Sequence, residues 1–317
     1  MATKLQMMSE LSRHVTSELT RSVENWTHFL DSAAWLYKYP FHDQVLIHAQ
    51  RPTATACAPI ELWNDTFLRW VNKGAKGIAL IDDSGFTPRL KYVFDIADTN
   101  TRYNVPFRLW ETKPEHAEQI ITELQNHFGE TGGDFKDAQL HEHIIGVIIN
   151  AVNDNYKDYA DALLNCCAGS ALDDKEDEEI TGILLMQLLT SVSYTTMTRM
   201  GLDPHILFSG SEFDDLHLFD TPATIAQLGS ATSDISEMVL RQIERSVRSI
   251  EKQERDTLAN TNQLVQNDNR KSERSEHYGT GIQGERGLHY LKTLAKTAHN
   301  TLFTRSPQNY YFGGLEV

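Results

Sequence analysis

The sequence has few cysteines and no obvious membrane-targeting segment. Its three cysteines are Cys57, Cys166 and Cys167, and the last two are chain neighbours that ordinarily do not bridge to each other. This is not a disulfide framework, so we expect a reducing compartment. The first fourteen residues contain no apolar signal core. The apolar stretch at 143–152 is far shorter than the roughly 20 residues that span a bilayer. We therefore expect a cytoplasmic protein that is not inserted in a membrane.

Motifs for the common catalytic chemistries are also missing. The histidines of the His-Glu-His run at 141–143 are two residues apart, and position 145 is Ile145, whereas a zinc-peptidase helix needs histidines four apart. Cys166 and Cys167 lack the spacing of a zinc or redox pair. The turn at 74–77 is too short for a phosphate loop and has no hydroxyl to hold magnesium. These absences predict a non-enzymatic protein with no metal and no cofactor.

Charge is distributed unevenly along the chain. Its 44 acidic and 29 basic residues give a net charge of −15. Residues 1–110 have a net charge of +1, residues 111–240 of −19 and residues 241–317 of +3. Nucleic-acid binding depends on local positive charge, so this balance argues against a uniformly basic coat protein but allows a local basic groove. The asymmetry suggests that the blocks have different roles or partners.

Hydrophobic periodicity predicts helices followed by a small sheet in the first third of the chain. Apolar residues from Trp26 to Tyr37 recur at steps of three and four, which is one helical face. Pro40 interrupts this helix, and a second short helix is expected at Asp43–Gln50. Short β-like runs separated by glycine-containing turns then follow, at Ala58–Trp63, Ile78–Ile81 and Leu90–Ile96.

After Pro106 the pattern becomes helical. Helices are expected at 115–128, 135–153, 156–168 and 173–200, then a short one from Pro222 and a long one from Thr232 or Ser233 to about Thr257. Residues 258–287 are polar and predict a linker, with a short helix possible at 288–303.

The expected fold class is α+β, with N-terminal helices and a small antiparallel sheet followed by an all-α acidic domain. The domains predicted are 1–112, 113–257, and a linker and tail at 258–317. Such a tail suits a truncated or domain-excised version of a longer protein.

Basic and aromatic residues are interleaved in the β-rich segment. The bases are Arg51, Arg69, Lys73, Lys76, Arg89 and Lys91, and the rings are Trp63, Phe67, Trp70, Tyr92 and Phe94. On a small curved sheet such residues can bind a single strand, because cations follow the phosphates while rings stack on bases. The same rings could instead form the core, and composition favours neither alternative.

Four stretches in this region resemble the N-terminal domain of ArdC-type antirestriction proteins. They are WTHFLDSAAWLYKYPFHDQVLIHAQRP at 26–52, ELWN at 61–64, RWVNKGAKGIALID at 69–82 and YVFDIADT at 92–99. Similar domains precede helicase and methyltransferase modules in long proteins of conjugative elements. The resemblance implies binding of single-stranded DNA and protection of incoming DNA during transfer. The metallopeptidase-like domain of that family, with its His-Glu-x-x-His helix, is not found here, so no peptidase role is expected.

The resemblance and the composition together define a predicted DNA-binding set. The positions within the family motif are Gln50, Arg51, Arg69, Trp70, Lys73 and Lys76. The residues added from composition are Trp63, Arg89, Lys91 and Tyr92. The expected partner is single-stranded DNA, bound without sequence preference.

An alternative function uses the acidic block at 111–240. Its carboxylates could engage a basic host defence nuclease of a restriction or CRISPR system, because complementary charge speeds encounter and sets the register of binding. The protein would then be an anti-defence inhibitor, such as an anti-CRISPR protein. A third possibility is that the acidic helices only connect modules.

Overall fold

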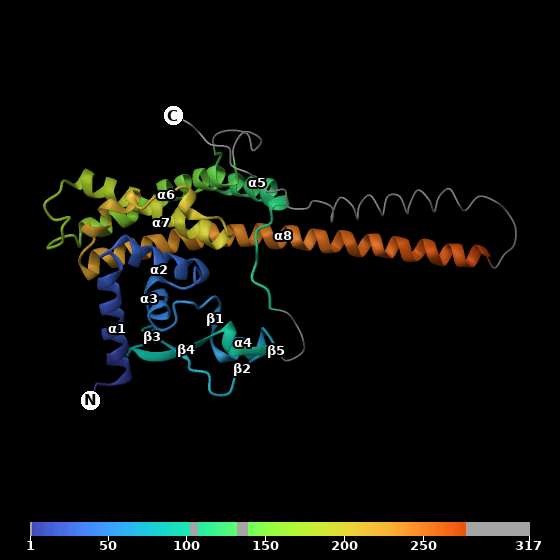
Figure 1. Ribbon diagram of the computed structural model, residues 1–317, viewed down its shortest axis with the longest axis horizontal. Helices are drawn as coiled ribbons and strands as arrows, with labels where there is room; N and C mark the ends of the chain where they lie inside the picture. The colour runs from blue at the N-terminus through green and yellow to red at the C-terminus, as the bar shows by residue number, and fades with distance from the viewer. Residues whose placement is uncertain (1, 102–106, 132–138, 277–317) are drawn as a thin grey trace. The chain divides into compact units, whose positions relative to one another are not determined.

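The computed structural model describes residues 2–101, 107–131 and 139–276. The chain divides into one unit of residues 1–251 and a second of residues 252–317, with the division inside the last helix. The first unit contains every element discussed below except the end of that helix (Figure 1).

Three helices open the chain, and local sequence signals define their ends. They are α1 (Lys4–Leu19), α2 (Val23–Trp35) and α3 (Phe41–Gln50). The Thr3 hydroxyl accepts a bond from the Gln6 backbone N–H, and the Gln6 side chain accepts one from the Thr3 N–H, which is a capping box. Ser22 caps α2 in the same position, accepting from the N–H of Asn25. Pro40 directly precedes α3, so the predicted break between the second and third helices is confirmed.

Five short strands form two small antiparallel sheets. The strands are β1 (Cys57–Ala58), β2 (Arg69–Val71), β3 (Ile78–Asp82), β4 (Arg89–Asp95) and β5 (Thr99–Thr101). The larger sheet has the order β1-β4-β3, with Ile78 opposite Val93, and the smaller one pairs β2 with β5. The face with Ile78, Leu80 and Val93 packs on α3 through Leu46 and Ile47. Between β1 and β2 lies the helix α4 (Ile60–Asp65).

The rest of the first unit is helical. Its α-helices are α5 (Ala117–Phe128), α6 (Leu140–Leu164), α7 (Asp177–Met200) and α8 (Pro222–Glu276). Short 3₁₀ helices lie at η1 (Ile96–Asp98), η2 (Pro114–His116), η3 (Pro204–Ile206) and η4 (Ser211–Leu218). Gly201 ends α7 with φ 76°, a left-handed conformation that favours glycine, as its position in the sequence predicts. The fold class expected from the sequence, α+β with a small antiparallel sheet, is confirmed.

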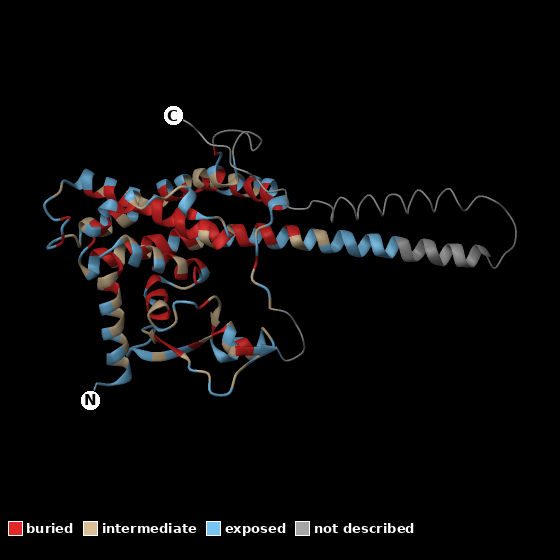
Figure 2. Cartoon of the chain, in the orientation of Figure 1, coloured by how far each residue is buried: buried red, intermediate tan, exposed pale blue. Residues whose placement is uncertain are grey.

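The main hydrophobic core joins the N-terminal helices to the helical region. Trp26 and Phe29 of α2 belong to the same buried cluster as Val192 of α7 and Ile235 of α8. The indole N–H of Trp26 donates to the Ser191 hydroxyl at 2.9 Å. Buried residues accordingly follow α7 and the first part of α8 (Figure 2). The expected boundary at residue 112 therefore does not separate two cores.

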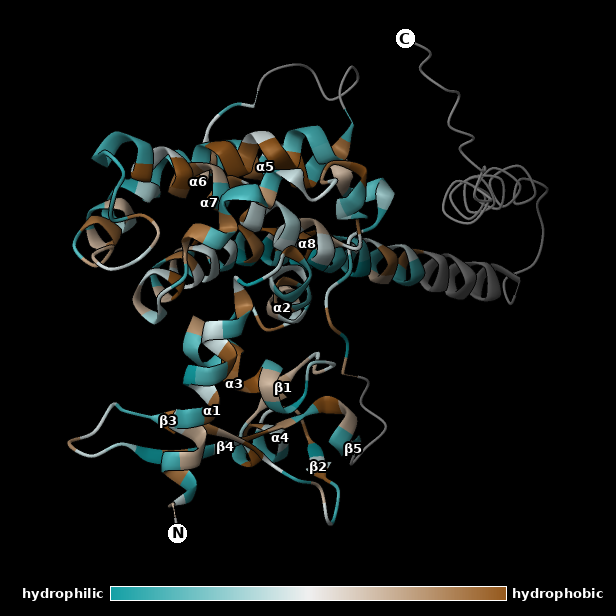
Figure 3. Ribbon diagram, turned by 60° about the vertical axis from the view of Figure 1, so that its left-hand side comes forward, coloured by the Kyte–Doolittle hydropathy of each residue, from teal (hydrophilic) through white to brown (hydrophobic). Residues whose placement is uncertain are grey.

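Helix α7 is unusually apolar. It is long and apolar enough to cross a membrane by length and composition alone, but 67% of its most apolar window is buried inside the fold. A core helix passes the same test, so this is weak evidence for a membrane span. Figure 3 shows both hydrophobic and hydrophilic residues along α5 and α6. The expectation of no membrane span rested on residues 143–152 and overlooked α7.

Several expected elements differ from those observed. Ile60–Trp63, expected in a strand, lies in α4, while β2 and β5 were not expected. The helices predicted at 135–153 and 156–168 are a single helix, α6, within the described residues. The two predicted C-terminal helices are also one, because α8 continues to Glu276 through the first part of the predicted linker. The short helix suggested at 288–303 lies outside the described residues.

Candidate functional site

Two residues of the predicted DNA-binding set stabilise the sheets instead of facing outward as free groups. The Gln50 amide donates to the Ala79 carbonyl and accepts from the Ala79 N–H, both at 2.9 Å, and so fastens the end of α3 to β3. The Arg69 guanidinium donates to the Thr99 hydroxyl at 2.7 Å and to its carbonyl at 3.1 Å. The Gln50 amide is thus engaged through both its oxygen and its nitrogen, and the Arg69 guanidinium through two of its nitrogens.

Three further bases of the set have carboxylate partners. Arg51 pairs with Asp98 and lies 3.8 Å from Asp95. Arg89 pairs with Asp82, the residue opposite it across β3 and β4, at 2.8 Å. The Lys91 ammonium donates to buried Asp43 at 2.8 Å. A phosphate that approached any of these cations would compete with a carboxylate already in place.

Trp63 is a core residue. Its side chain is 1% exposed, and its indole N–H donates to the Phe94 carbonyl at 2.8 Å. A base cannot stack on this ring in the conformation observed. The sequence left open whether these rings bind DNA or form the core, and Trp63 forms part of the core.

Besides Arg89 and Lys91, which are exposed but ion-paired, four members of the set lie at the surface. Trp70 is 43% and Tyr92 40% exposed, and Lys73 and Lys76 are exposed in the turn between β2 and β3. Neither lysine has an ion pair within the described residues. The turn approaches the Tyr92 ring, since a Cβ atom on Gly77 would lie 3.2 Å from it. This exposed group is smaller than the ten-residue set and defines no cavity.

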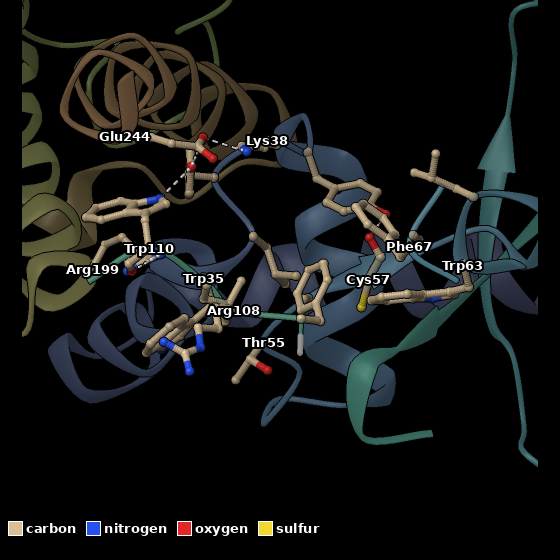
Figure 4. Close-up of a pocket in the computed structure, with 18 of the residues that line it drawn as sticks. Trp35, Lys38, Thr55, Cys57, Trp63, Phe67, Arg108, Trp110, Arg199 and Glu244 are labelled. Atoms are coloured by element: carbon tan, nitrogen blue, oxygen red, sulfur yellow. Dashed lines mark hydrogen bonds and ion pairs between the residues drawn. The ribbon is translucent and has the colours of Figure 1, made fainter. Parts of the chain in front are cut away.

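The rings and cations that do converge line a cleft within the first unit, in a place the sequence did not indicate. The cleft has a volume of about 390 Å³ and lies among the end of α2, strand β1, helix α4, the segment 107–110 and the helices α7 and α8 (Figure 4). Seven aromatic residues line it: Trp35, Tyr37, Tyr39, Trp63, Phe67, Phe107 and Trp110. It also has four basic residues and one acidic residue: Lys38, Arg108, Arg199, Arg248 and Glu244.

The rings of the cleft form two groups. Trp63, Phe67 and Phe107 are in mutual contact, with ring centroids 5.0–5.4 Å apart. Trp35 and Trp110 belong to the other group, which Figure 4 shows at the opposite end. Trp35, at 37% exposed, is accessible to a ligand, whereas Trp110 is buried.

Glu244 organises the polar side of the cleft. Its carboxylate accepts from the Tyr37 hydroxyl at 2.7 Å, from Lys38 at 2.6 Å and from Arg248 at 2.7 Å. The Trp110 indole N–H in turn donates to the Tyr37 oxygen at 3.0 Å. Burial alone would raise the pKa of Glu244, but these hydrogen bonds outweigh it and lower the pKa to about 2. The ionised carboxylate of Glu244 thus forms ion pairs with both Lys38 and Arg248.

The other two bases have no such carboxylate. Arg199 is buried between Trp35 and Trp110, with its guanidinium carbon 4.7 Å and 3.6 Å from the ring centroids. It donates one hydrogen bond, to the Trp110 carbonyl at 3.0 Å. Arg108 is exposed and has no ion pair within the described residues. Four cations and one carboxylate give the cleft an excess of positive charge.

Cys57 is the cysteine that lines the cleft. Burial raises the pKa of the Cys57 thiol to about 12, so this thiol is protonated at neutral pH. Among the residues that the structure describes, no group of three or more His, Cys, Asp or Glu could hold a metal ion.

The cleft residues were missed because they come from segments far apart in the chain. Trp35-Leu36-Tyr37-Lys38-Tyr39 and Phe107-Arg108-Leu109-Trp110 each combine bases with rings, which is the pattern that drew attention to 50–95. Arg199 also had a signal, since it is the sole Lys or Arg between Lys175 and Arg241 and the one charged residue between Glu179 and Asp203. Their convergence depends on the packing of α2 against α7 and α8.

No family model, curated protein or solved structure matches this chain.

Proposed function

We propose that this protein binds single-stranded DNA without sequence preference and without enzymatic activity, and that it protects DNA during transfer in the manner of antirestriction proteins. The bases of a single strand are free to stack on protein rings, and its phosphates attract arginine and lysine. A cleft that combines aromatic walls with uncompensated cations provides both kinds of contact.

The observation that carries the proposal is the pair Arg108 and Arg199 beside the exposed ring of Trp35. Both arginines lack a carboxylate partner within the described residues, in a chain whose net charge is −15. Most bases of the sheet have an intramolecular partner, so uncompensated arginines in a cleft support an anionic ligand. The aromatic lining favours a ligand that also has flat apolar faces.

The exposed turn between β2 and β3 has a secondary role in this proposal. Lys73 and Lys76 would contact phosphates of the strand beyond the cleft. Tyr92 would add a ring, although the Lys4 ammonium already lies 4.7 Å from its centroid. Gln50, Arg51, Arg69, Arg89 and Lys91 then position the sheets, and Trp63 supports one wall of the cleft.

The proposal is tested by fluorescence anisotropy of a labelled oligothymidylate titrated with the full chain at two ionic strengths. The full chain is needed because residues on both sides of position 112 form the core. We expect binding that weakens steeply with salt, since each phosphate contact on a single strand contributes about −0.7 to the slope of log K against log[salt]. Duplex DNA of the same length is the comparison ligand. A full chain with no affinity for the oligonucleotide at low salt would refute the proposal.

A second candidate function rests on the acidic start of α7. Asp173, Asp174, Glu176, Asp177 and Glu178 are exposed, and the one lysine among them, Lys175, pairs with Glu179. Such a surface suits a basic protein partner, as an inhibitor of a restriction or CRISPR nuclease would require. Nuclease assays with the full chain, and with Asp173, Asp174 and Glu176 replaced by Asn, Asn and Gln, test it. Unchanged cleavage in the presence of the unmodified chain would eliminate this candidate.

A further inference from the structure

Arg199 is a buried cation with unused hydrogen-bonding capacity. Arg199 is only 4% exposed. Its guanidinium has five N–H groups, but it donates one hydrogen bond within the described residues, to the Trp110 carbonyl. No carboxylate of the described residues forms an ion pair with it. Glu244 and Glu111 interact with the Arg199 charge electrostatically, without an ion pair to it. A buried charge without a partner is costly, so this position favours a site for an anion.

The surroundings of Arg199 fix which part of it can bind. The Trp35 and Trp110 rings both lie against the guanidinium, with centroids 4.7 and 3.6 Å from its central carbon, and such cation–π contacts are favourable. Further hydrogen bonds can therefore form only at its edge. The edge of a guanidinium presents paired N–H groups that match the oxygens of a phosphate. Burial lowers the pKa of Arg199 to about 10, which leaves it protonated at neutral pH.

Arg108 supplies a second cation to the same end of the cleft. Arg108, Trp35 and Arg199 all line the cleft, and Figure 4 shows them toward the same end of the view. Lys38 and Arg248 differ from it, because both are engaged by Glu244. Two arginines without an ion pair in the described residues therefore line the cleft together with the exposed Trp35 ring. The volume of about 390 Å³ lies within the range of roughly 300–1,000 Å³ typical of small-molecule sites.

We infer that this end of the cleft is a subsite for one nucleotide, with its phosphate on Arg199 and Arg108 and its base against the aromatic wall. The choice of a nucleotide as ligand rests on the proposed function, whereas the anion site rests on Arg199 and Arg108. The subsite binds a free nucleoside monophosphate as well as a nucleotide of a strand. The shared ligand chemistry is a phosphate attached to a flat aromatic base.

The test follows the intrinsic tryptophan fluorescence of the full chain, since Trp35 and Trp110 lie in the cleft. The protein is titrated separately with thymidine monophosphate, thymidine and inorganic phosphate. We expect the monophosphate to bind with a Kd of about 1 mM or tighter, and at least tenfold more tightly than either of the others. Equal affinity for thymidine and its monophosphate would overturn the phosphate site. Equal affinity for inorganic phosphate and the monophosphate would overturn the base contact.

Variants of Arg199 and Arg108 test whether the fluorescence change reports binding at these two residues. Arg199→Lys keeps the charge but loses the planar edge, and we expect it to weaken monophosphate binding tenfold or more. Arg108→Ala alters an exposed side chain, so it remains informative should the Arg199 variant fail to fold. The matched control is Arg13→Ala, which removes an exposed arginine of α1 that is absent from the cleft lining. Equal affinities of Arg108→Ala and Arg13→Ala for the monophosphate would contradict the inference.

The oligothymidylate titration separates this inference from the proposed function. Binding of the oligonucleotide without binding of the monophosphate refutes the nucleotide subsite and leaves strand binding intact. Binding of the monophosphate without the oligonucleotide refutes strand binding and retains the subsite. Absence of both signals overturns both.

Discussion

The sheet and the cleft both contain aromatic and basic residues, but the basic residues have different partners in the two regions. In the sheet, arginines and lysines meet carboxylates from neighbouring elements, as in Arg51 with Asp98 and Lys91 with Asp43. In the cleft, Arg108 and Arg199 have no ion pair within the described residues, and Arg199 lies against two tryptophan rings. A cluster of bases along the sequence is therefore a poor guide to a binding surface, because what remains for a ligand is the charge left uncompensated after folding.

Replacing Trp35 should have the largest effect on strand binding. Trp35→Ala removes an exposed ring of the cleft and one of the two rings that hold Arg199. Stacking of a base on an aromatic side chain contributes about 1–3 kcal/mol, and we expect a loss of that size in anisotropy titrations. Trp70→Ala, which removes a ring of similar exposure from the sheet, is the comparison. A greater loss for Trp70→Ala than for Trp35→Ala would locate the stacking surface on the sheet.

Removing one arginine from the cleft and one from the sheet tests whether an intramolecular carboxylate partner makes an arginine less available to DNA. Arg108→Ala should reduce the magnitude of the salt slope by about 0.7, the value for one phosphate contact on a single strand. Arg89→Ala should alter the slope less, because Arg89 already pairs with Asp82 at 2.8 Å. Both residues are exposed, so the two variants differ mainly in that partner. Equal slopes for the two variants would show that intramolecular pairing does not distinguish the regions.

Stability should depend on pH through Glu244. Its pKa is lowered from 4.5 to about 2 in the folded chain, so the ionised form stabilises the fold. This contribution is complete above a pH of about 4.5 and is lost as the pH falls toward about 2. Glu244→Gln should therefore lose stability at neutral pH and show a flatter dependence over that interval. Urea unfolding at a series of pH values measures both, and parallel curves for the two proteins would exclude this role.

The smallest effect is expected from the exposed turn. Lys73→Ala and Lys76→Ala should each weaken strand binding slightly and leave stability unchanged, because neither side chain has an ion pair in the described part of the chain. Chemical denaturation provides the stability measurement and anisotropy the affinity. Should this pair of substitutions abolish binding while the cleft variants retain it, the roles of the two regions would be reversed.

The fold was largely predictable where the hydrophobic pattern was long. The spacing from Trp26 to Tyr37, the break at Pro40 and the stop at Gly201 each follow from local physics. Strands β2 and β5 have three residues each, too few for an alternating pattern. The Ile60–Trp63 run was predicted as a strand, yet it follows Pro59 and forms α4. Short segments of this kind are decided by tertiary packing.

The candidate site was much less predictable. Burial of Trp63 and the ion pairs of Arg51 and Lys91 depend on contacts between residues 31 to 48 positions apart. The cleft depends on longer separations still, since Tyr37 bonds Glu244 across 207 positions. Periodicity in one sequence contains no information about such pairs. The association of bases with rings in the sequence pointed to residues 50–95, whereas in the structure rings and cations converge in a cleft whose lining comes mostly from other segments.

Ultraviolet cross-linking of an oligothymidylate to the full chain, followed by mass spectrometry of the tryptic peptides, tests the central claim most directly. We predict cross-links in peptides that contain Trp35 or residues 107–110, and their loss when free thymidine monophosphate is added. Cross-links confined to peptides with Trp70 or Tyr92, unaffected by the monophosphate, would contradict the account.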